Sequence, residues 1–275
     1  MHSRAKKALE IFLKEDIGKG DVTSKLLPRK KISAVIISRQ RGIIAGTSYV
    51  KEIFTSRNCK VRILKNDGSK IEPNDKIMTI SGYAYSVLSC ERTALNLLSR
   101  MSGIATQTNK LVRIIKNVNP KVELYSTRKT APGLRIFDKD AIEIGGGRRH
   151  RMSLDQMVMI KDNHLAVAKS LQDIIRAAKK RYKKFEVEVE NRDDAVIAAR
   201  EGASIIMLDN IPPKEISHII QVLKRLNLRN RIKIEASGGI DESNVKSYAR
   251  TGIDIISMGR LTSSVPGLDL SLEVN

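Results

Sequence analysis

Residues 185–210 read FEVEVENRDDAVIAAREGASIIMLDN, and their pattern decides the fold. A β-branched run at 185–189 is followed by helix-forming residues at 192–201 and by a second apolar run at 204–208. The same order repeats outward, which predicts further strands at 122–127, 157–160, 232–236 and 254–258 and further helices at 138–144, 166–182, 213–226 and 241–250. Strands that alternate with helices in this way are typical of parallel βαβ units. Six such strands predict either an open doubly wound sheet or a closed barrel.

The polar residues at the strand ends discriminate between these two folds. An open sheet concentrates its ligand-binding groups at one switch point, whereas a barrel gathers the ends of all its strands around one mouth. Here each predicted strand ends in a candidate site residue, so the distribution favours a barrel. In chain order these residues are Arg128 and Lys129; Lys161; Glu188 and Glu190; Asp209; Ser237, Gly238 and Gly239; and Gly259 with Arg260.

The first hundred residues have a different pattern. A helix is predicted at 4–15, and short strands bounded by turn residues are predicted at 32–39, 42–46, 60–65 and 76–81. Residues 87–118 form a long helical pattern, in which we expect Gly103 to mark a break. This region is therefore expected to differ in architecture from the rest of the chain.

Cationic residues cluster between residues 128 and 164, in glycine-rich turns and at the ends of apolar runs. They are Arg128, Lys129, Arg148, Arg149, His150, Arg151, Lys161 and His164. Forked Arg side chains bind carboxylates and phosphates, and Lys adds a mobile charge. The cluster therefore predicts a small substrate with several negative charges.

The net charge of +20 first suggests a nucleic-acid-binding protein. However, aromatic residues make up 4% of the chain, and neither a zinc-ligand spacing nor an RNA-binding aromatic motif is present. We therefore expect no nucleic-acid partner. The excess of Lys indicates a solvated surface that attracts polyanionic metabolites.

Two glycine turns follow the last two predicted strands, at 236–240 and 258–260. Backbone N–H groups in such turns often bind phosphate in barrels, although ordinary tight turns would look the same. In the strand at 186–190, Val187 and Val189 should pack under the helices while three Glu face inward. Unpaired buried carboxylates are prohibitive, so at least Glu188 must meet cations or a metal. With Asp209 it could hold Mg²⁺ or ribose hydroxyls, or the two could form structural salt bridges.

The sequence contains no motif for several other classes of active site. The chain contains no Gly-x-Ser-x-Gly nucleophile elbow, no Walker-type loop and no dinucleotide-binding Gly-x-Gly-x-x-Gly after a strand. Cys59 and Cys90 lack a metal-binding spacing and predict reduced thiols in a cytoplasmic protein. We expect no signal peptide and no membrane association, because the N-terminus lacks an apolar segment and no apolar run approaches about 20 residues.

The segments that carry these residues resemble quinolinate phosphoribosyltransferases in order and over nearly the whole chain. The similar segments are Glu15–Ser24, Glu91–Asn96, Ser102–Thr106, Thr127–Arg135, Gly145–Arg151, Lys161–His164, Glu186–Asn191, Met207–Asn210, Glu235–Gly239 and Ser263–Pro266. The resemblance implies transfer of the phosphoribosyl group of phosphoribosyl pyrophosphate (PRPP) to quinolinate with decarboxylation, in NAD biosynthesis.

The resemblance also implies the architecture and the assembly. An N-terminal α/β sandwich domain over 1–105 is expected, followed by a six-stranded, TIM-like α/β barrel over 106–265. The tail at 266–275 is expected to return to the first domain. A homodimer with shared active sites, or a higher oligomer, is implied as well.

By the same resemblance, quinolinate is expected to meet Arg128, His150, Arg151 and Lys161, together with Arg92 of the neighbouring subunit. PRPP and its Mg²⁺ are expected at Lys129, Lys161, Glu188 and Asp209, with the metal bound to the two carboxylates directly or through water. Ser237, Gly238, Gly239 and Gly259 are expected to hold the 5-phosphate. Arg149, where the family often has Asn, has no predicted role.

Three other functions stay open at this stage. A non-decarboxylating paralogue of the type associated with molybdate transport shares the segments around Arg92 and Arg128, but the Gly-Gly-Gly-Arg-Arg-His-Arg stretch argues against it. A nicotinate phosphoribosyltransferase would need only one carboxylate anchor. A basic nucleic-acid-binding protein remains the alternative from another class.

Overall fold

The computed structural model describes residues 3–274, which form two compact units. The first unit comprises residues 3–109, 130–146 and 261–274, and the second comprises residues 110–129 and 147–260. No helix in the described range is long and apolar enough to span a membrane. The two units differ in the direction of their strands, as the change of sequence pattern predicts.

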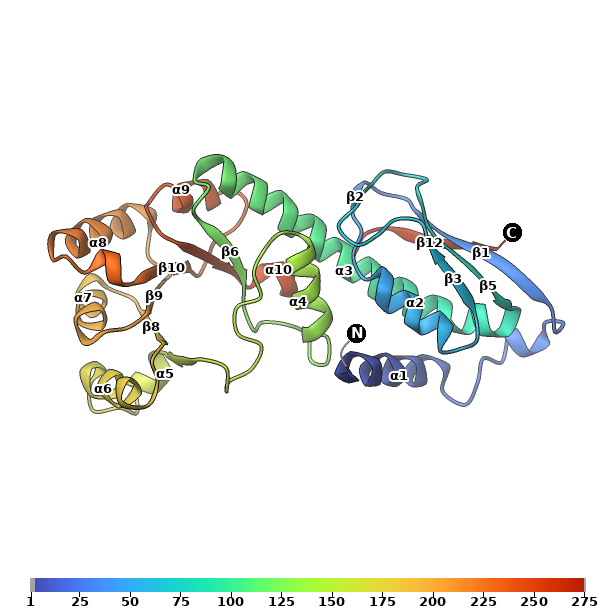
Figure 1. The fold of residues 1–275 in the computed structure, drawn as a ribbon, viewed down its shortest axis with the longest axis horizontal. Coiled ribbons are helices and arrows are strands. Elements are labelled where there is room, and N and C mark those ends of the chain that lie inside the picture. Colours follow the sequence, from blue (N-terminus) through green and yellow to red (C-terminus); the bar gives the residue numbers. More distant parts are fainter. Residues whose placement is uncertain (1–2, 275) are drawn as a thin grey trace. The chain divides into compact units, whose positions relative to one another are not determined.

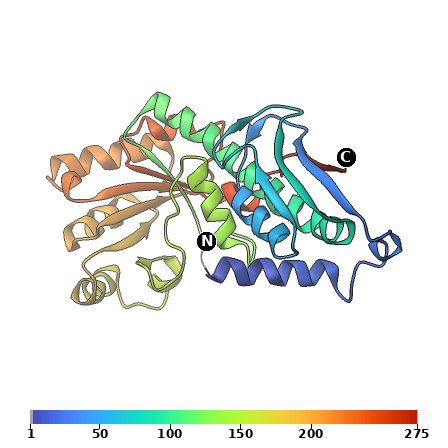
Figure 2. The ribbon, with the colours of Figure 1, turned by 45° about the vertical axis from the view of Figure 1, so that its right-hand side comes forward.

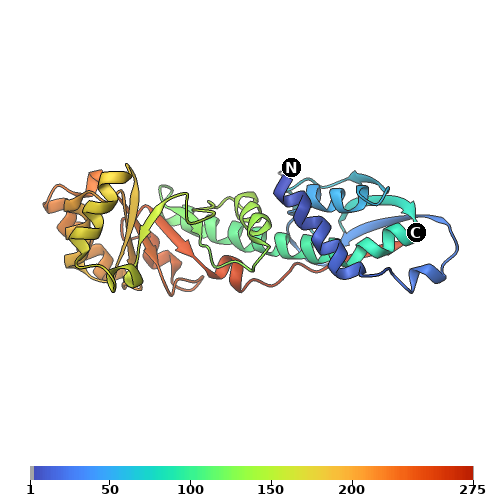
Figure 3. The same ribbon diagram turned by 90° about the horizontal axis from the view of Figure 1, so that it is seen from below.

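The first unit is built on an antiparallel sheet with the strand order β12-β1-β5-β3. These strands are β1 (Lys31–Ser38), β3 (Lys60–Ile63), β5 (Lys76–Tyr83) and β12 (Leu270–Val274). The last strand of the chain thus pairs with the first. A small second sheet pairs β2 (Gly42–Ile43) with β4 (Lys70–Ile71). Figure 2 shows this unit from one side and Figure 3 shows it from below.

The α-helices of the first unit bury apolar residues, whereas the short helix η1 buries only Ser24. They are α1 (Ser3–Ile17), η1 (Ser24–Leu26), α2 (Thr47–Thr55), most of α3 (Ala84–Val118), α4 (Arg135–Ile144) and α10 (Arg260–Ser263), which begins at the last residue of the second unit. Helix α2, which has no counterpart among the predicted elements, buries Val50, Ile53 and Phe54. Helix α4 is attached to α3 by Arg100, whose Nε and Nη2 donate hydrogen bonds of 2.7 and 2.8 Å to the fully buried carboxylate of Asp138.

The predicted break at Gly103 is wrong. Helix α3 is continuous from Ala84 to Val118, and Gly103 lies inside it. A Cβ atom at Gly103 would collide with the backbone carbonyl of Pro266. The glycine therefore permits the segment before β12 to approach the helix closely, and this approach outweighs the lower helix propensity of glycine.

The second unit contains a parallel sheet of six strands in the order β6-β11-β10-β9-β8-β7. The strands are β6 (Glu123–Ser126), β7 (Val158–Ile160), β8 (Phe185–Val189), β9 (Ile205–Asp209), β10 (Lys233–Ser237) and β11 (Ile255–Met258). Their helical partners are α5 (Asp162–Leu165), α6 (Leu171–Arg181), α7 (Arg192–Glu201), α8 (Pro213–Arg225), η2 (Arg229–Arg231) and α9 (Val245–Ala249). In Figure 1, α6, α7 and α8 line one side of β8, β9 and β10.

The expected class of fold, a mixed α/β chain with six parallel strands in the second part, is confirmed. Within residues 3–274 no strand pairing joins β6 to β7, so the ring of hydrogen bonds is open between them. The open edge of β6 is occupied by the segment at 147–149. Arg148 donates its N–H to Leu124 over 2.8 Å, and Ser126 donates to the Arg148 carbonyl over 3.0 Å. The glycine-rich stretch thereby lies beside the first strand of the sheet.

Candidate active site

A cavity of about 440 Å³ lies at the carboxyl ends of the strands of the second unit. Strands β6 to β10 each contribute a polar residue within one position of their last residue. The wall contains Thr127, Arg128, Lys129, His150, Arg151, Leu154, Met159, Lys161, His164, Glu188, Met207, Asp209, Glu235, Ser237 and Ser257. Residues dispersed over 130 positions of the sequence thus meet in one place, as parallel strands with a common direction require.

The arginines of the cavity are close enough to influence one another. Burial and the neighbouring Arg128 lower the pKa of the Arg151 guanidinium. That group donates a hydrogen bond of 3.2 Å to the Met157 carbonyl. The Nε atom of Arg128 is buried and has no hydrogen-bond partner among the described residues. Since a buried donor without a partner costs about 1–3 kcal/mol, the cavity is suited to an anion that accepts from it.

Lys161 and Glu188 form an ion pair across the ends of β7 and β8. The side chain of Glu188 is 11% exposed and that of Lys161 is 36% exposed, so the pair is partly shielded from water. The backbone N–H of Lys161 donates to Nδ1 of His164 over 3.0 Å, which fixes the start of α5. His164 thus holds the loop that carries Lys161.

The glycine turns have the backbone conformations that their residues allow. Gly238 and Gly239 have φ values of +85° and +60°, and a Cβ at Gly238 would lie 2.8 Å from the backbone nitrogen of Asn210. Asn210 in turn donates its N–H to the Ser237 carbonyl over 2.9 Å. A Cβ at Gly259 would lie 2.8 Å from Cδ of Lys129. The turn at Gly238 therefore requires glycine, whereas the absence of a side chain at Gly259 leaves room for Lys129.

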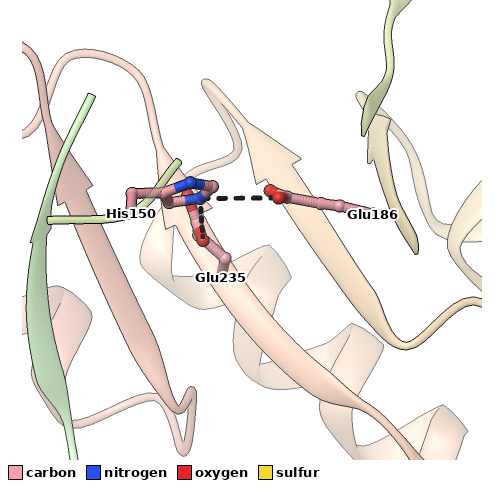
Figure 4. A group of neighbouring side chains, drawn as sticks. All are labelled: His150, Glu186 and Glu235. Atoms are coloured by element: carbon pink, nitrogen blue, oxygen red, sulfur yellow. Dashed lines mark ion pairs between the residues drawn. The ribbon is translucent and has the colours of Figure 1, made fainter. Parts of the chain in front are cut away.

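A buried cluster of one histidine and two carboxylates was not predicted as a group. Nε2 of His150 lies 3.4 Å from Oε2 of Glu186 and 3.4 Å from Oε2 of Glu235, as Figure 4 shows. Both carboxylates are fully buried, and none of their four oxygens accepts a hydrogen bond from the described residues. Burial, followed by the neighbouring Glu235, raises the pKa of Glu186 to about 9. Burial therefore favours the uncharged form of Glu186.

The alternating sequence of β8 predicts that its three glutamates share one face, but it does not show which of them is buried. Glu186, Glu188 and Glu190 share one face of the strand. In the structure Glu190 is exposed, Glu188 is paired with Lys161 and Glu186 is fully buried. Glu235 belongs to an apolar strand whose sequence gives no sign of a buried carboxylate partner.

The remaining predicted site residue, Arg92, is exposed on α3 in the first unit. It does not belong to the described wall of the cavity. Its assignment to a neighbouring subunit stays a prediction.

Comparisons with known proteins agree with this arrangement. The family model "Quinolinate phosphoribosyl transferase, N-terminal domain" matches residues 21–102, and "Quinolinate phosphoribosyl transferase, C-terminal domain" matches residues 104–273. A probable nicotinate-nucleotide pyrophosphorylase [carboxylating] of Archaeoglobus fulgidus is 47% identical over 93% of this chain and 98% of its own length. The human nicotinate-nucleotide pyrophosphorylase [carboxylating] is 37% identical over 88% of this chain and 82% of its own.

The structural similarity covers both units. The nicotinate-nucleotide pyrophosphorylase of Francisella tularensis has a TM-score of 0.92 at 35% identity, over 99% of this chain and 96% of that chain. The two family models together match most of the sequence, in the order in which the two domains occur in the family. The chain therefore belongs to the quinolinate phosphoribosyl transferase family.

Proposed function

We propose that this chain transfers the phosphoribosyl group of PRPP to quinolinate, with release of pyrophosphate and CO₂, and so forms nicotinate mononucleotide for NAD biosynthesis. The relatives reported above carry the name of this activity. The observation that supports it most directly is the cavity at the strand ends. Four cationic side chains surround it, which suits two substrates that are both polyanions. Those four are Arg128, Lys129, Arg151 and Lys161.

Quinolinate fits the half of the cavity that contains the two arginines. Its two adjacent carboxylates match two guanidinium groups, and the buried Nε of Arg128 offers a donor without another partner among residues 3–274. Lys161 completes the proposed contacts of this chain, with Arg92 of a neighbouring subunit, and His150 lines the same part of the cavity. The pyridine nitrogen of quinolinate is unprotonated at neutral pH and attacks C1 of the ribose without a general base.

PRPP fits the half of the cavity that is lined by Lys129 and Ser237, beside the glycine turns. Ser237, Gly238, Gly239 and Gly259 are proposed to hold the 5-phosphate through their backbone, and a side chain is sterically excluded at Gly238. Lys129, beside Gly259, is proposed to contact the pyrophosphate. The short helices α9 and α10 that follow these turns contribute little dipole, so the binding rests on the turns and on Lys129.

Glu188 and Asp209 are the proposed ligands of Mg²⁺, bound directly or through water. Both line the cavity at neighbouring strand ends, and carboxylate oxygens are the donors that Mg²⁺ prefers. Asp209 accepts a hydrogen bond of 2.8 Å from the Asn210 side chain, and Glu188 is paired with Lys161. These partners orient the two carboxylates. When bound, Mg²⁺ supplies charge compensation for the departing pyrophosphate.

The residues of this chain contribute mainly position and charge. The arginines hold the quinolinate ring so that its nitrogen displaces pyrophosphate from C1, and Lys161 and Lys129 stabilise the negative charge that leaves. The product ring is a pyridinium, which accepts the electron pair released when the C2 carboxylate leaves as CO₂. A proton then replaces that carboxylate at C2.

We further propose a homodimer with shared active sites and a cytoplasmic location. Support for the first comes from Arg92, whose exposed position leaves it accessible to a second copy of the chain. Support for the second comes from Cys59 and Cys90, which are both free and buried, as is usual in a reducing compartment.

The test is incubation of the purified chain with quinolinate, PRPP and Mg²⁺, with detection of nicotinate mononucleotide and CO₂. Nicotinate replaces quinolinate in a parallel reaction and should give no product. Comparable product from nicotinate, or a nucleotide formed without CO₂, would refute the assignment and favour one of the related transferases. The Asp209→Asn variant should lose turnover with PRPP while it binds quinolinate, as isothermal calorimetry can measure.

A further inference from the structure

His150 is the one non-glycine residue between 75 and 209 for which the structure gives a left-handed backbone, with φ of +55°. Its side chain is 7% exposed, and both ring nitrogens face groups of the protein. Nδ1 accepts the N–H of Arg151 over 2.8 Å, while Nε2 faces Glu186 and Glu235 at 3.4 Å each (Figure 4). A second ring, that of Tyr125, meets the imidazole edge-on at 5.6 Å.

These contacts define where the imidazole carries its proton. A ring nitrogen that accepts an N–H is itself unprotonated, so the proton of the neutral ring lies on Nε2 and faces the two carboxylates. Neither nitrogen is then left for a substrate carboxylate. A metal ion on Nε2 is disfavoured for the same reason, because it would need the lone pair of a nitrogen that bears hydrogen.

The kink at His150 connects two segments that are each tied to the sheet. Before it, the backbone of Arg148 is bonded to β6, and the Ser126 hydroxyl donates to the Arg149 carbonyl over 3.0 Å. After it, the Arg151 guanidinium reaches Met157 and Met159 next to β7. A left-handed residue that is not glycine persists only when its surroundings hold it. In this structure the contacts of the His150 ring are what can hold its backbone in the left-handed conformation.

We propose that Glu186, Glu235 and His150 form a buried anchor that holds this kink and thereby aims Arg151 into the cavity. His150 then acts as a positioning residue for Arg151 and has no contact of its own with quinolinate. The inference rests on the proposed function, because it takes Arg151 to be a quinolinate anchor. It adds Glu186 and Glu235 to the residues on which quinolinate binding depends.

Glu186 allows a clean test because it is fully buried and outside the wall of the cavity. Any effect of its substitution on quinolinate must therefore travel through its neighbours. Glu186→Leu removes one of the two carboxyl groups that face Nε2, whereas Glu186→Gln keeps an amide oxygen at that position. Misplacement of a binding group by about 1 Å costs on the order of 10²-fold. We expect Glu186→Leu to raise KM for quinolinate at least tenfold with KM for PRPP little changed, and Glu186→Gln to restore it.

Two substitutions of His150 separate its contacts. His150→Asn keeps an acceptor near the position of Nδ1, and His150→Gln keeps a donor near the position of Nε2. Since the anchor needs both sides, each variant should raise KM for quinolinate. Asp254→Asn serves as the matched control: Asp254 accepts from Ile234 N over 2.7 Å and Arg229 Nη2 over 2.8 Å at the amino ends of β10 and β11. It should lower the melting temperature and leave KM for quinolinate unchanged.

Nitrogen-15 NMR of the histidine rings gives a readout that needs no turnover. The His150 signal, identified by its loss in His150→Gln, should show a protonated Nε2 and an unprotonated Nδ1. A protonated Nδ1, or a stoichiometric metal ion that Glu186→Leu abolishes, would overturn the anchor. So would a normal KM in Glu186→Leu alongside a raised KM in His150→Gln, because His150 would then contact the substrate itself. If the wild-type chain makes no nicotinate mononucleotide, the proposed function fails, and NMR still decides the position of the proton.

Discussion

The Gly238→Ala substitution tests the proposed phosphate-binding turn at 236–240. The loss of folding stability that it should cause can be estimated from the structure. Alanine at φ of +85° is strained by about 1–3 kcal/mol. Its Cβ would also lie 2.8 Å from the backbone nitrogen of Asn210, and the necessary shift weakens the bond from that nitrogen to the Ser237 carbonyl. Loss of such a bond costs about 0.5–1.5 kcal/mol. We expect a destabilisation of about 2–4 kcal/mol and, because the turn moves, a KM for PRPP raised at least tenfold.

Gly252→Ala is the control for backbone strain. Gly252 has φ of +92°, and its added Cβ would meet only Ile220 at 3.8 Å, an ordinary contact. At about 2–4 °C per kcal/mol, both variants should melt earlier, and Gly238→Ala should melt earlier by more. Steady-state kinetics with each substrate varied in turn separates KM for PRPP from KM for quinolinate. A Gly238→Ala enzyme with the melting temperature of the control and a normal KM for PRPP would refute the assignment of this turn to phosphate.

Three further predictions concern buried and exposed charges. The pKa of Glu186 is higher in the folded protein than in the unfolded chain, so its burial destabilises the wild type increasingly as pH rises from about 4.5 to 9. Glu186→Gln has no such carboxyl group. Its melting temperature should therefore fall less than that of the wild type over this pH range. Arg100→Leu leaves the fully buried Asp138 without its partner and should cost about 3–5 kcal/mol in chemical denaturation, less where Asp138 takes up a proton. If Arg92 acts in a partner's site, refolding Arg92→Ala together with Lys161→Ala should restore activity that neither homodimer shows, and tagged co-purification checks that mixed dimers form.

Much of the second unit could be predicted from local pattern. The alternation at 185–189 and the helix formers at 192–201 are set by backbone periodicity, and β8 and α7 have those same bounds. Strand direction then brings the strand ends together, so a cavity with Lys161 and Asp209 in its wall follows without knowledge of any contact. Periodicity and strand direction are properties that a sequence carries locally.

The features that could not be predicted depend on distant neighbours. Gly103 has the local appearance of a helix break, and only the approach of Pro266 explains why it is a glycine inside α3. The ring of His150 lies against Tyr125 and against carboxylates from two other strands. The opening between β6 and β7 follows from the segment at 147–149 occupying the edge of β6. Each of these is a tertiary contact between residues far apart in sequence.

The raised pKa of Glu186 affects the charge of the whole cavity. Two ionised carboxylates beside Arg151 would compensate much of the positive charge that the arginines bring to the site. Burial favours the protonated form of the Glu186 carboxyl, so the group facing His150 carries less negative charge than an exposed glutamate would. The excess of cations around the cavity is thus preserved for the substrate. A buried acidic residue is in this way compatible with a binding site for anions. Its contribution to the electrostatic potential of the site depends on its protonation state and not on its residue type.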